Sequence, residues 1–166
     1  LDAQQCTNTT IVDPTPPPTS VLDVNLIGVF YTTHLALHYF RLLPSSNSNN
    51  TSPPRSKQLV LMASLASYLD LPMAADYQAS KFGVRGLFKA VRGRPGLLGE
   101  ERPVLRCNLV APTFVRIPAT EELEEVLREM GSRMAEVGDV VEGVLRVVAD
   151  ESVSGTLCLL CFSHGR

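Results

Sequence analysis

Three short apolar runs, separated by longer segments of helical character, constrain the fold more than any other feature of this sequence. They cover residues 59–63, 104–110 and 156–162. The first run is continuous rather than alternating, which is typical of a parallel strand covered on both faces. Parallel neighbours need a crossover connection, and the segments between these runs are helical. The sequence therefore predicts an α/β fold with a parallel sheet.

The helical segments are recognised by the period of their apolar residues and by their boundaries. Residues 21–43 carry apolar side chains around much of the helix circumference, which predicts burial on more than one side. A second helix is expected at about 75–92, before a Gly-Arg-Pro-Gly breaker. Residues 121–135 are expected to form a charged helix, and Asp139 is expected to cap another that runs through Val148.

Three strands are few for an open parallel sheet, and so small a sheet would leave a hydrophobic edge exposed. We therefore expect residues 1–166 to be one partial domain of a larger α/β unit. The proline-rich segment before residue 20 predicts an extended lead into the first helix.

Composition and charge exclude several classes of protein. The 166 residues are 45% hydrophobic and 19% charged, which is typical of a globular chain. The net charge is −2 and no basic stripe is visible, so nucleic acid is not an expected partner. Continuous apolar runs fall short of a bilayer crossing and no leader is recognisable, so we expect no membrane partner and a cytoplasmic location.

No metal site is expected. Cys158 and Cys161 have the spacing of a metal knuckle, but no second pair completes it, and small core residues are the favoured interpretation. His34 and His38 lie four residues apart, also without a third ligand.

A serine, a tyrosine and a lysine follow the first apolar run at spacings that suit acid–base chemistry. Ser64 comes just past the carboxyl end of a predicted parallel strand, where open α/β sheets bind their ligands. Tyr77 and Lys81 are four apart on a predicted helix and share one face. The lysine ammonium favours the tyrosinate, which suits Tyr77 to act as a general acid or base. Ser64 would donate a hydrogen bond to the same substrate oxygen.

This pattern resembles the active-site motif of the short-chain dehydrogenase/reductase family: a serine, twelve residues, a tyrosine, three residues and a lysine. Residues 77–81 read Tyr-Gln-Ala-Ser-Lys, similar to the family's Tyr-x-Ala-Ser-Lys. Residues 22–28 resemble the helix that carries a catalytic asparagine, here Asn25. Residues 106–115 resemble the strand and loop that cover the nicotinamide, and 140–154 the last helix and its exit. The resemblance spans about residues 18–166 and is strongest for fungal members; Ser67, closer to Tyr77, misses the spacing.

The resemblance implies a Rossmann-like doubly wound sheet and NAD or NADP as cofactor. Tyr77 would exchange a proton with a small-molecule alcohol or ketone while hydride moves to or from the nicotinamide. Lys81 would bind the nicotinamide ribose, Ser64 would orient the substrate oxygen, and Asn25 would hold a relay water. Cofactor contacts are expected at six positions: Tyr77, Lys81, Pro112, Thr113, Val115 and Ile117. Thr113 and Ile117 depart from the glycine and threonine usual in the family.

The sequence contains no glycine-rich turn of the kind that binds the cofactor pyrophosphate in this family. We therefore expect this sequence to correspond to the C-terminal part of the family's domain, without its glycine-rich βαβ portion. Two hypotheses remain open: an NAD(P)-dependent oxidoreductase, or an inactive fragment that acts as a dimerising or interaction module. The family pairs its subunits through helices that match residues 21–43 and 75–92, which implies a homodimer or homotetramer.

Overall fold

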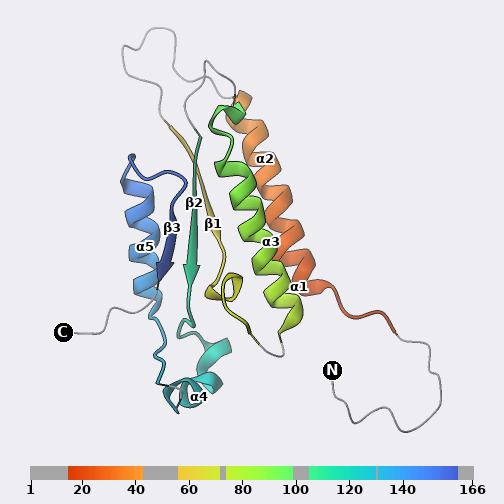
Figure 1. Cartoon of the computed structure of the whole chain (residues 1–166), viewed down its shortest axis with the longest axis vertical. Coiled ribbons are helices and arrows are strands. Elements are labelled where there is room, and N and C mark those ends of the chain that lie inside the picture. The colour runs from red at the N-terminus through yellow and green to blue at the C-terminus, as the bar shows by residue number, and fades with distance from the viewer. Residues whose placement is uncertain (1–14, 43–55, 72–73, 99–104, 130, 161–166) are drawn as a thin grey trace.

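The computed structural model describes residues 15–42, 56–71, 74–98, 105–129 and 131–160, and these form an α/β fold (Figure 1). Strands β1 (Lys57–Met62), β2 (Leu105–Pro112) and β3 (Leu157–Leu160) build one parallel sheet in the order β1-β2-β3. The three predicted strands and their parallel arrangement are confirmed, with ends that differ by up to two residues. Because the strands are parallel, their carboxyl ends meet at one edge of the sheet.

Helices cover both faces of this sheet (Figure 1). One face carries α1 (Ser20–Leu22), a π-helical turn (Asp23–Ile27), α2 (Gly28–Leu42) and α3 (Ala75–Arg92). The other face carries α5 (Val137–Ala149). A 3₁₀ helix (Pro118–Leu123) and α4 (Glu124–Glu129) lie beyond the carboxyl ends of the strands. The helix predicted at 75–92 is confirmed.

The core lies between the sheet and α3. Val84, Phe88 and Val91 of α3 are buried together with Leu61 of β1 and Leu109 of β2. All eight residues of β2 are buried, as expected of a central strand that is covered on both faces. This packing holds α3 against the strands from which the functional site is built.

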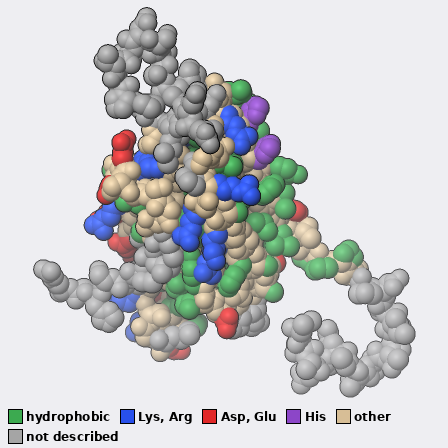
Figure 2. Space-filling view, turned by 45° about the horizontal axis from the view of Figure 1, so that its top comes forward, with side chains coloured by type: hydrophobic (Ala, Val, Ile, Leu, Met, Phe, Trp, Pro, Cys, Tyr) green, Lys and Arg blue, Asp and Glu red, His purple; other side chains and the backbone are tan. Residues whose placement is uncertain are grey.

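The expectation that residues 21–43 are buried on more than one side is wrong. Among Ser20–Leu42 only Thr33 is buried, while Leu26, Val29 and Phe40 pack partly against the core. The outer face exposes seven large apolar side chains: Val24, Ile27, Phe30, Tyr31, Leu35, Tyr39 and Leu42. Hydrophobic side chains accordingly gather along this flank in Figure 2. The apolar period reflects two faces, of which the sheet of this chain covers one.

Ser20–Leu42 is also, by length and composition alone, able to cross a membrane. This span has 23 residues. An 18-residue window within it has a mean hydropathy of 1.3, and 6% of that window is buried. The sequence analysis considered only the length of continuous apolar runs. This helix is interrupted by polar residues, but its mean hydropathy is high enough for a membrane-spanning segment. Core helices of soluble proteins pass the same test, so the finding identifies an uncovered apolar helix and no more.

Two further expectations need correction. The charged helix predicted at 121–135 ends at Glu129, because Gly131 adopts a positive φ of 71° and Ala135 pairs with Val115 as an isolated bridge. The last long helix begins at Val137, and Asp139 caps it from inside, with its carboxylate accepting the N–H of Glu136 at 2.8 Å.

Metal-binding residues do not gather in the described part of the chain, where no group of three His, Cys, Asp or Glu side chains could hold an ion. His34 and His38 lie on α2, and Cys158 lies in β3. Cys161 lies outside the described residues.

Candidate active site

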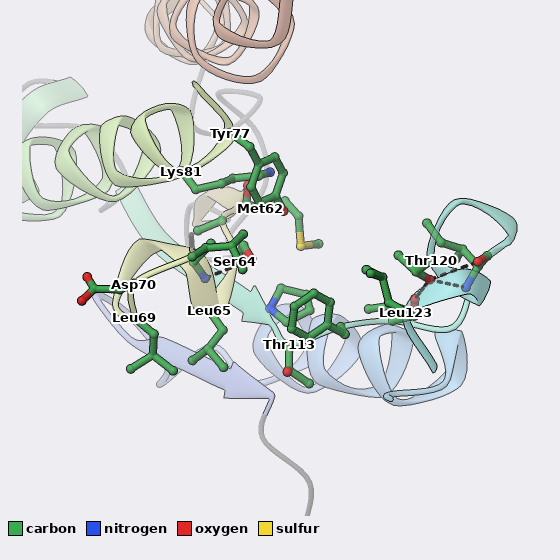
Figure 3. Close-up of a pocket in the computed structure, with 17 residues that line it drawn as sticks. Met62, Ser64, Leu65, Leu69, Asp70, Tyr77, Lys81, Thr113, Thr120 and Leu123 are labelled. Carbon is green, nitrogen blue, oxygen red and sulfur yellow. Dashed lines mark hydrogen bonds between the residues drawn. The ribbon is translucent and has the colours of Figure 1, made fainter. Parts of the chain in front are cut away.

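A cavity of about 490 Å³ opens at the carboxyl ends of β1 and β2 (Figure 3). Three segments line it: the residues that follow β1, the first turns of α3, and the residues from Pro112 to Leu123. This is the edge at which open α/β sheets bind ligands, because the loops there are carried by rigid strands. The volume is within the usual range of small-molecule sites.

The structure brings Ser64, Tyr77 and Lys81 together in this cavity, as the sequence predicts. Ser64 has an extended backbone and caps the short 3₁₀ turn Leu65–Ser67. Its Oγ accepts the N–H of Ala66 at 3.2 Å, so its own proton remains free to be donated to a ligand. Tyr77 and Lys81 lie one turn apart on α3, with Lys81 Nζ 5.5 Å from the centre of the Tyr77 ring.

The Lys81 ammonium sits in partly dehydrated surroundings. Its Nζ lies 3.5 Å from the carbonyl oxygen of Met62, a distance at the limit of a hydrogen bond. Burial lowers the pKa of Lys81 below the usual value of a lysine, because desolvation penalises the charged form. Lys81 is therefore a cation directed at the cavity whose proton is held less tightly than that of a surface lysine.

A clamp of three residues joins the Ser64 turn to α3. Ser67 is fully buried and donates from its hydroxyl to the main-chain carbonyl of Lys81 at 3.0 Å. Arg85, one turn further along α3, donates to the carbonyl of Ser67 at 3.0 Å. Its guanidinium stacks 4.0 Å from the centre of the Tyr68 ring. Ser67 does not line the cavity, whereas Ser64 does, but its hydrogen bond ties the turn after β1 to the helix that carries Tyr77 and Lys81.

Asn25 does not line the cavity. It lies in the π-helical turn, and its Nδ2 donates to Ser80 Oγ over a long 3.4 Å. Ser80 is fully buried and donates in turn to the carbonyl of Tyr77 at 2.6 Å. The structure thus connects Asn25 to the helix that carries Tyr77, and not to the position expected for a ligand or relay water.

The four residues expected to contact the cofactor from the second strand all line the cavity: Pro112, Thr113, Val115 and Ile117. Phe114 and Arg116, on either side of Val115, make the ladder bonds to Ala135. The N–H of Val115 itself makes no hydrogen bond within the described residues. A donor of this kind, on a segment that lines the same cavity as Lys81 and Tyr77, fits a ligand with an amide and hydroxyl groups, as nicotinamide riboside has.

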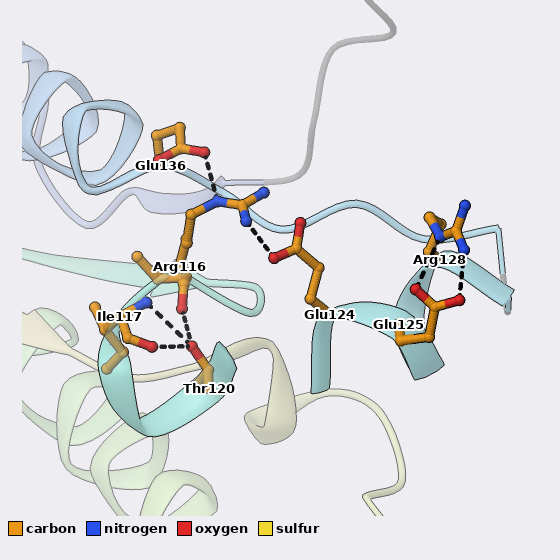
Figure 4. Close-up of polar contacts among 8 residues, drawn as sticks. Arg116, Ile117, Thr120, Glu124, Glu125, Arg128 and Glu136 are labelled. Atoms are coloured by element: carbon orange, nitrogen blue, oxygen red, sulfur yellow. Dashed lines mark hydrogen bonds and ion pairs between the residues drawn. The ribbon is translucent and has the colours of Figure 1, made fainter. Parts of the chain in front are cut away.

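Residues 117–129, which we call the lid, line one side of the cavity with Ile117, Thr120 and Leu123 and are held by ion pairs (Figure 4). Arg116 pairs with Glu124 of α4 and, at 2.9 Å, with Glu136 at the start of α5. Hydrogen bonds to these two carboxylates raise the pKa of Arg116. The hydrogen bond from Arg116 lowers the pKa of Glu124. Thr120 Oγ1 donates to the carbonyl of Val115 at 2.5 Å and accepts the N–H of Ile117 at 3.1 Å.

Sequence reasoning missed eight apolar residues of the lining: Met62, Ala63, Leu65, Ala66, Leu69, Leu71, Phe114 and Leu123. It also missed Asp70 and Thr120. All but Thr120 and Leu123 lie within seven residues of Ser64 or Pro112 in the chain, and that proximity was the only available signal. Which of their side chains turn inward depends on the path of each loop.

Comparison with known proteins agrees with the motif. Residues 15–128 match the family described as short chain dehydrogenase. An NADP-dependent dehydrogenase, clz5, of Cochliobolus lunatus is 41% identical over 147 residues, 86% of this chain and 50% of that protein. The 5′-hydroxyaverantin dehydrogenase of Dothistroma septosporum is 43% identical over 121 residues, 73% of this chain and 37% of that protein. The chain thus spans half the length of these relatives or less.

Solved structures share the fold. The 3-hydroxyacyl-CoA dehydrogenase type-2 of Mycobacterium avium superimposes with a TM-score of 0.66 at 20% identity, over 85% of this chain and 53% of that one. A 4-hydroxyisoleucine dehydrogenase mutant in complex with NADH and succinate gives a TM-score of 0.65 at 20% identity, over 83% of this chain and 55% of that one. At these identities the likeness establishes a Rossmann-like α/β fold.

Proposed function

The chain belongs to the short-chain dehydrogenase family, and on this premise we propose that its cavity is the site of NAD(P)-dependent interconversion of a secondary alcohol and a ketone. One observation carries the proposal: Ser64, Tyr77 and Lys81, from two separate segments, line one cavity at the carboxyl ends of β1 and β2. Strand ends, a loop and a helix must all be placed correctly for these three side chains to meet.

The residues present fit the nicotinamide end of the cofactor. Lys81 and Tyr77 would hold the ribose hydroxyls, and the free N–H of Val115 would hold the carboxamide. When bound, the nicotinamide supplies or accepts the hydride. The 166 residues contain no glycine-rich turn for the pyrophosphate, so the fit concerns one half of the cofactor only.

In the reducing direction, Tyr77 and Ser64 would both donate hydrogen bonds to the carbonyl oxygen of the substrate. As negative charge develops on that oxygen, the two hydroxyls stabilise it and Tyr77 transfers its proton. The adjacent Lys81 ammonium stabilises the tyrosinate that remains, because opposite charges attract strongly in a partly dehydrated site. Solvent would then return a proton to Tyr77.

Titration with NADH and with NADPH, followed by nicotinamide fluorescence, tests the proposal. Saturable binding is expected for at least one of them, and Lys81→Ala should weaken it at least tenfold. Lys89→Ala is the matched control, since Lys89 is exposed on the same helix and does not line the cavity. Absence of binding at millimolar concentration, or equal loss in both variants, would contradict the proposal for this chain.

A second function rests on the exposed apolar face of Ser20–Leu42. Seven large apolar side chains there have no cover within the described residues. Exposed patches of this kind mark interaction surfaces. We propose that a second copy of the chain covers this face, in a homodimer or homotetramer through α2 and α3. This pairing would persist in an inactive interaction module, so cofactor binding separates the two hypotheses.

A further inference from the structure

The mouth of the cavity exposes apolar side chains that no other part of the described chain covers. Leu69 is 56% exposed, Met62 and Ile117 are each 41% exposed, and Leu123 is 40% exposed. They come from two segments, the end of β1 with the residues after it and the residues from Pro112 to Leu123, and all line the same cavity. In a water-soluble chain, large apolar side chains gathered around a concave site are covered when the ligand binds.

The charge of the lining indicates a neutral ligand. Among the described lining residues Lys81 is the only cation, and its place beside Tyr77 engages it in the proposed chemistry. Asp70 is the only carboxylate and is exposed at the rim. The lining thus offers no second cation to a carboxylate or phosphate on the substrate, while Asp70 would repel such a group. Burial of a charge without a partner is strongly unfavourable, which disfavours anionic substrates.

The apolar wall on the lid side is held in place before any ligand binds. Thr120 bonds to the backbone of both Val115 and Ile117, and Arg116 ties this segment to Glu124 and Glu136 (Figure 4). Ile117 and Leu123, at the two ends of the 3₁₀ helix, are thereby anchored over the cavity. Apolar side chains that are already held in place lose little conformational entropy when a ligand binds, so their contacts with the ligand add to its affinity.

We propose that this cavity takes a neutral secondary alcohol or ketone with a large apolar body. The reacting oxygen would lie between Ser64 and Tyr77, and the apolar body would contact Leu69 on one side and Ile117 and Leu123 on the other. The proposal rests on the proposed function for the reaction and adds the class of substrate.

The test compares three ketones that differ in their bodies: 2-acetylnaphthalene, 2-butanone and pyruvate. Binding is measured by saturation-transfer NMR with the cofactor present, and reduction by loss of NADPH or NADH absorbance. We expect 2-acetylnaphthalene to bind and react at least tenfold better than either small ketone. Leu123→Asp should reduce its binding at least tenfold. Val126→Asp is the matched control, because Val126 is 52% exposed in α4 and does not line the cavity.

The outcomes separate the two claims. Reduction of pyruvate or 2-butanone as efficiently as 2-acetylnaphthalene would overturn the substrate class and leave the proposed function intact. Binding of 2-acetylnaphthalene that depends on Leu123, without any reduction, would support the apolar site and contradict the proposed reaction. Equal loss of binding in Leu123→Asp and Val126→Asp would overturn the assignment of the lid wall.

Discussion

At the scale of a single residue, the half-buried position of Lys81 affects the pH at which this side chain loses its charge. Desolvation lowers the pKa of Lys81, so the ammonium is lost at a lower pH than on an exposed lysine. Between that lowered pKa and the usual lysine value, the unfolded chain holds a proton that the folded chain has released. Stability should therefore rise with pH in this window, while any function that needs the ammonium declines there.

We predict that NADH or NADPH binding weakens on the alkaline side below the pH at which a free lysine titrates. Lys81→Arg should move this loss to higher pH, because a guanidinium stays charged throughout. Dissociation constants measured by nicotinamide fluorescence between pH 7 and 10.5 provide the test. Identical pH profiles for the two proteins would show that the charge of Lys81 does not control binding.

At the scale of elements, α3 and the π-helical turn approach each other closely at Gly83. A Cβ at this position would lie 2.6 Å and 2.7 Å from the two Cδ atoms of Leu26 and 3.2 Å from its Cγ. Gly86, one turn along the same helix, has nothing within 4 Å of such a Cβ. The contact sets the position of Leu26, and therefore of the neighbouring Asn25, against α3.

Alanine at these two glycines should have opposite effects on the free energy of unfolding. Gly86→Ala should stabilise the chain by about 0.5–1 kcal/mol, because alanine favours helix. Gly83→Ala gains the same propensity but must displace Leu26, and we expect a net loss of about 1–2 kcal/mol. Urea denaturation of both variants tests this. A gain in both would mean that Leu26 moves aside without cost.

The lid segment provides a second pair of matched variants. Glu124→Gln removes the carboxylate that pairs with Arg116 across two elements, whereas Glu125→Gln removes one that pairs with Arg128 within a single helix. We expect faster hydrogen exchange over residues 118–129 in Glu124→Gln and little change in Glu125→Gln. Equal protection in both variants would show that the Arg116 pair does not hold the lid.

The lid pair also predicts a direction with pH. The hydrogen bond from Arg116 lowers the pKa of Glu124. The ion pair is therefore fully formed above the usual pKa of a glutamate, and it is lost as the pH falls through the lowered pKa of Glu124. Hydrogen exchange of residues 118–129 at decreasing pH, corrected for the intrinsic rate, should show this loosening only below the pH at which an ordinary glutamate titrates.

At the scale of the whole molecule, the exposed face of Ser20–Leu42 predicts self-association. Phe30 is 54% exposed at the centre of this face, and a buried carboxylate there would be costly. We expect Phe30→Asp to shift the chain to a smaller species in analytical ultracentrifugation. Val126→Asp, on α4 and 52% exposed, is the control. A wild-type monomer would contradict the proposal.

Much of the architecture could be predicted from local pattern. Residues 75–92 combine a helical period with clear breakers on both sides, and the boundaries agree with α3. The mostly apolar segment at 104–110 corresponds to the fully buried β2, Leu105–Pro112. The four-residue offset of Tyr77 and Lys81 on a helix, together with the family motif that Ser64 completes, selected residues that line one cavity.

The sequence by itself determined the order and type of these elements and the chemistry at the strand ends, since periodicity, breakers and side-chain spacing act over a few residues. Only the tertiary structure decided which face of Ser20–Leu42 meets the sheet, where the 121–135 helix ends, and that Asn25 contacts Ser80 instead of the cavity. It alone also brought Leu69, Ile117 and Leu123 around one mouth. Such contacts depend on how separate segments pack, and no local pattern records that.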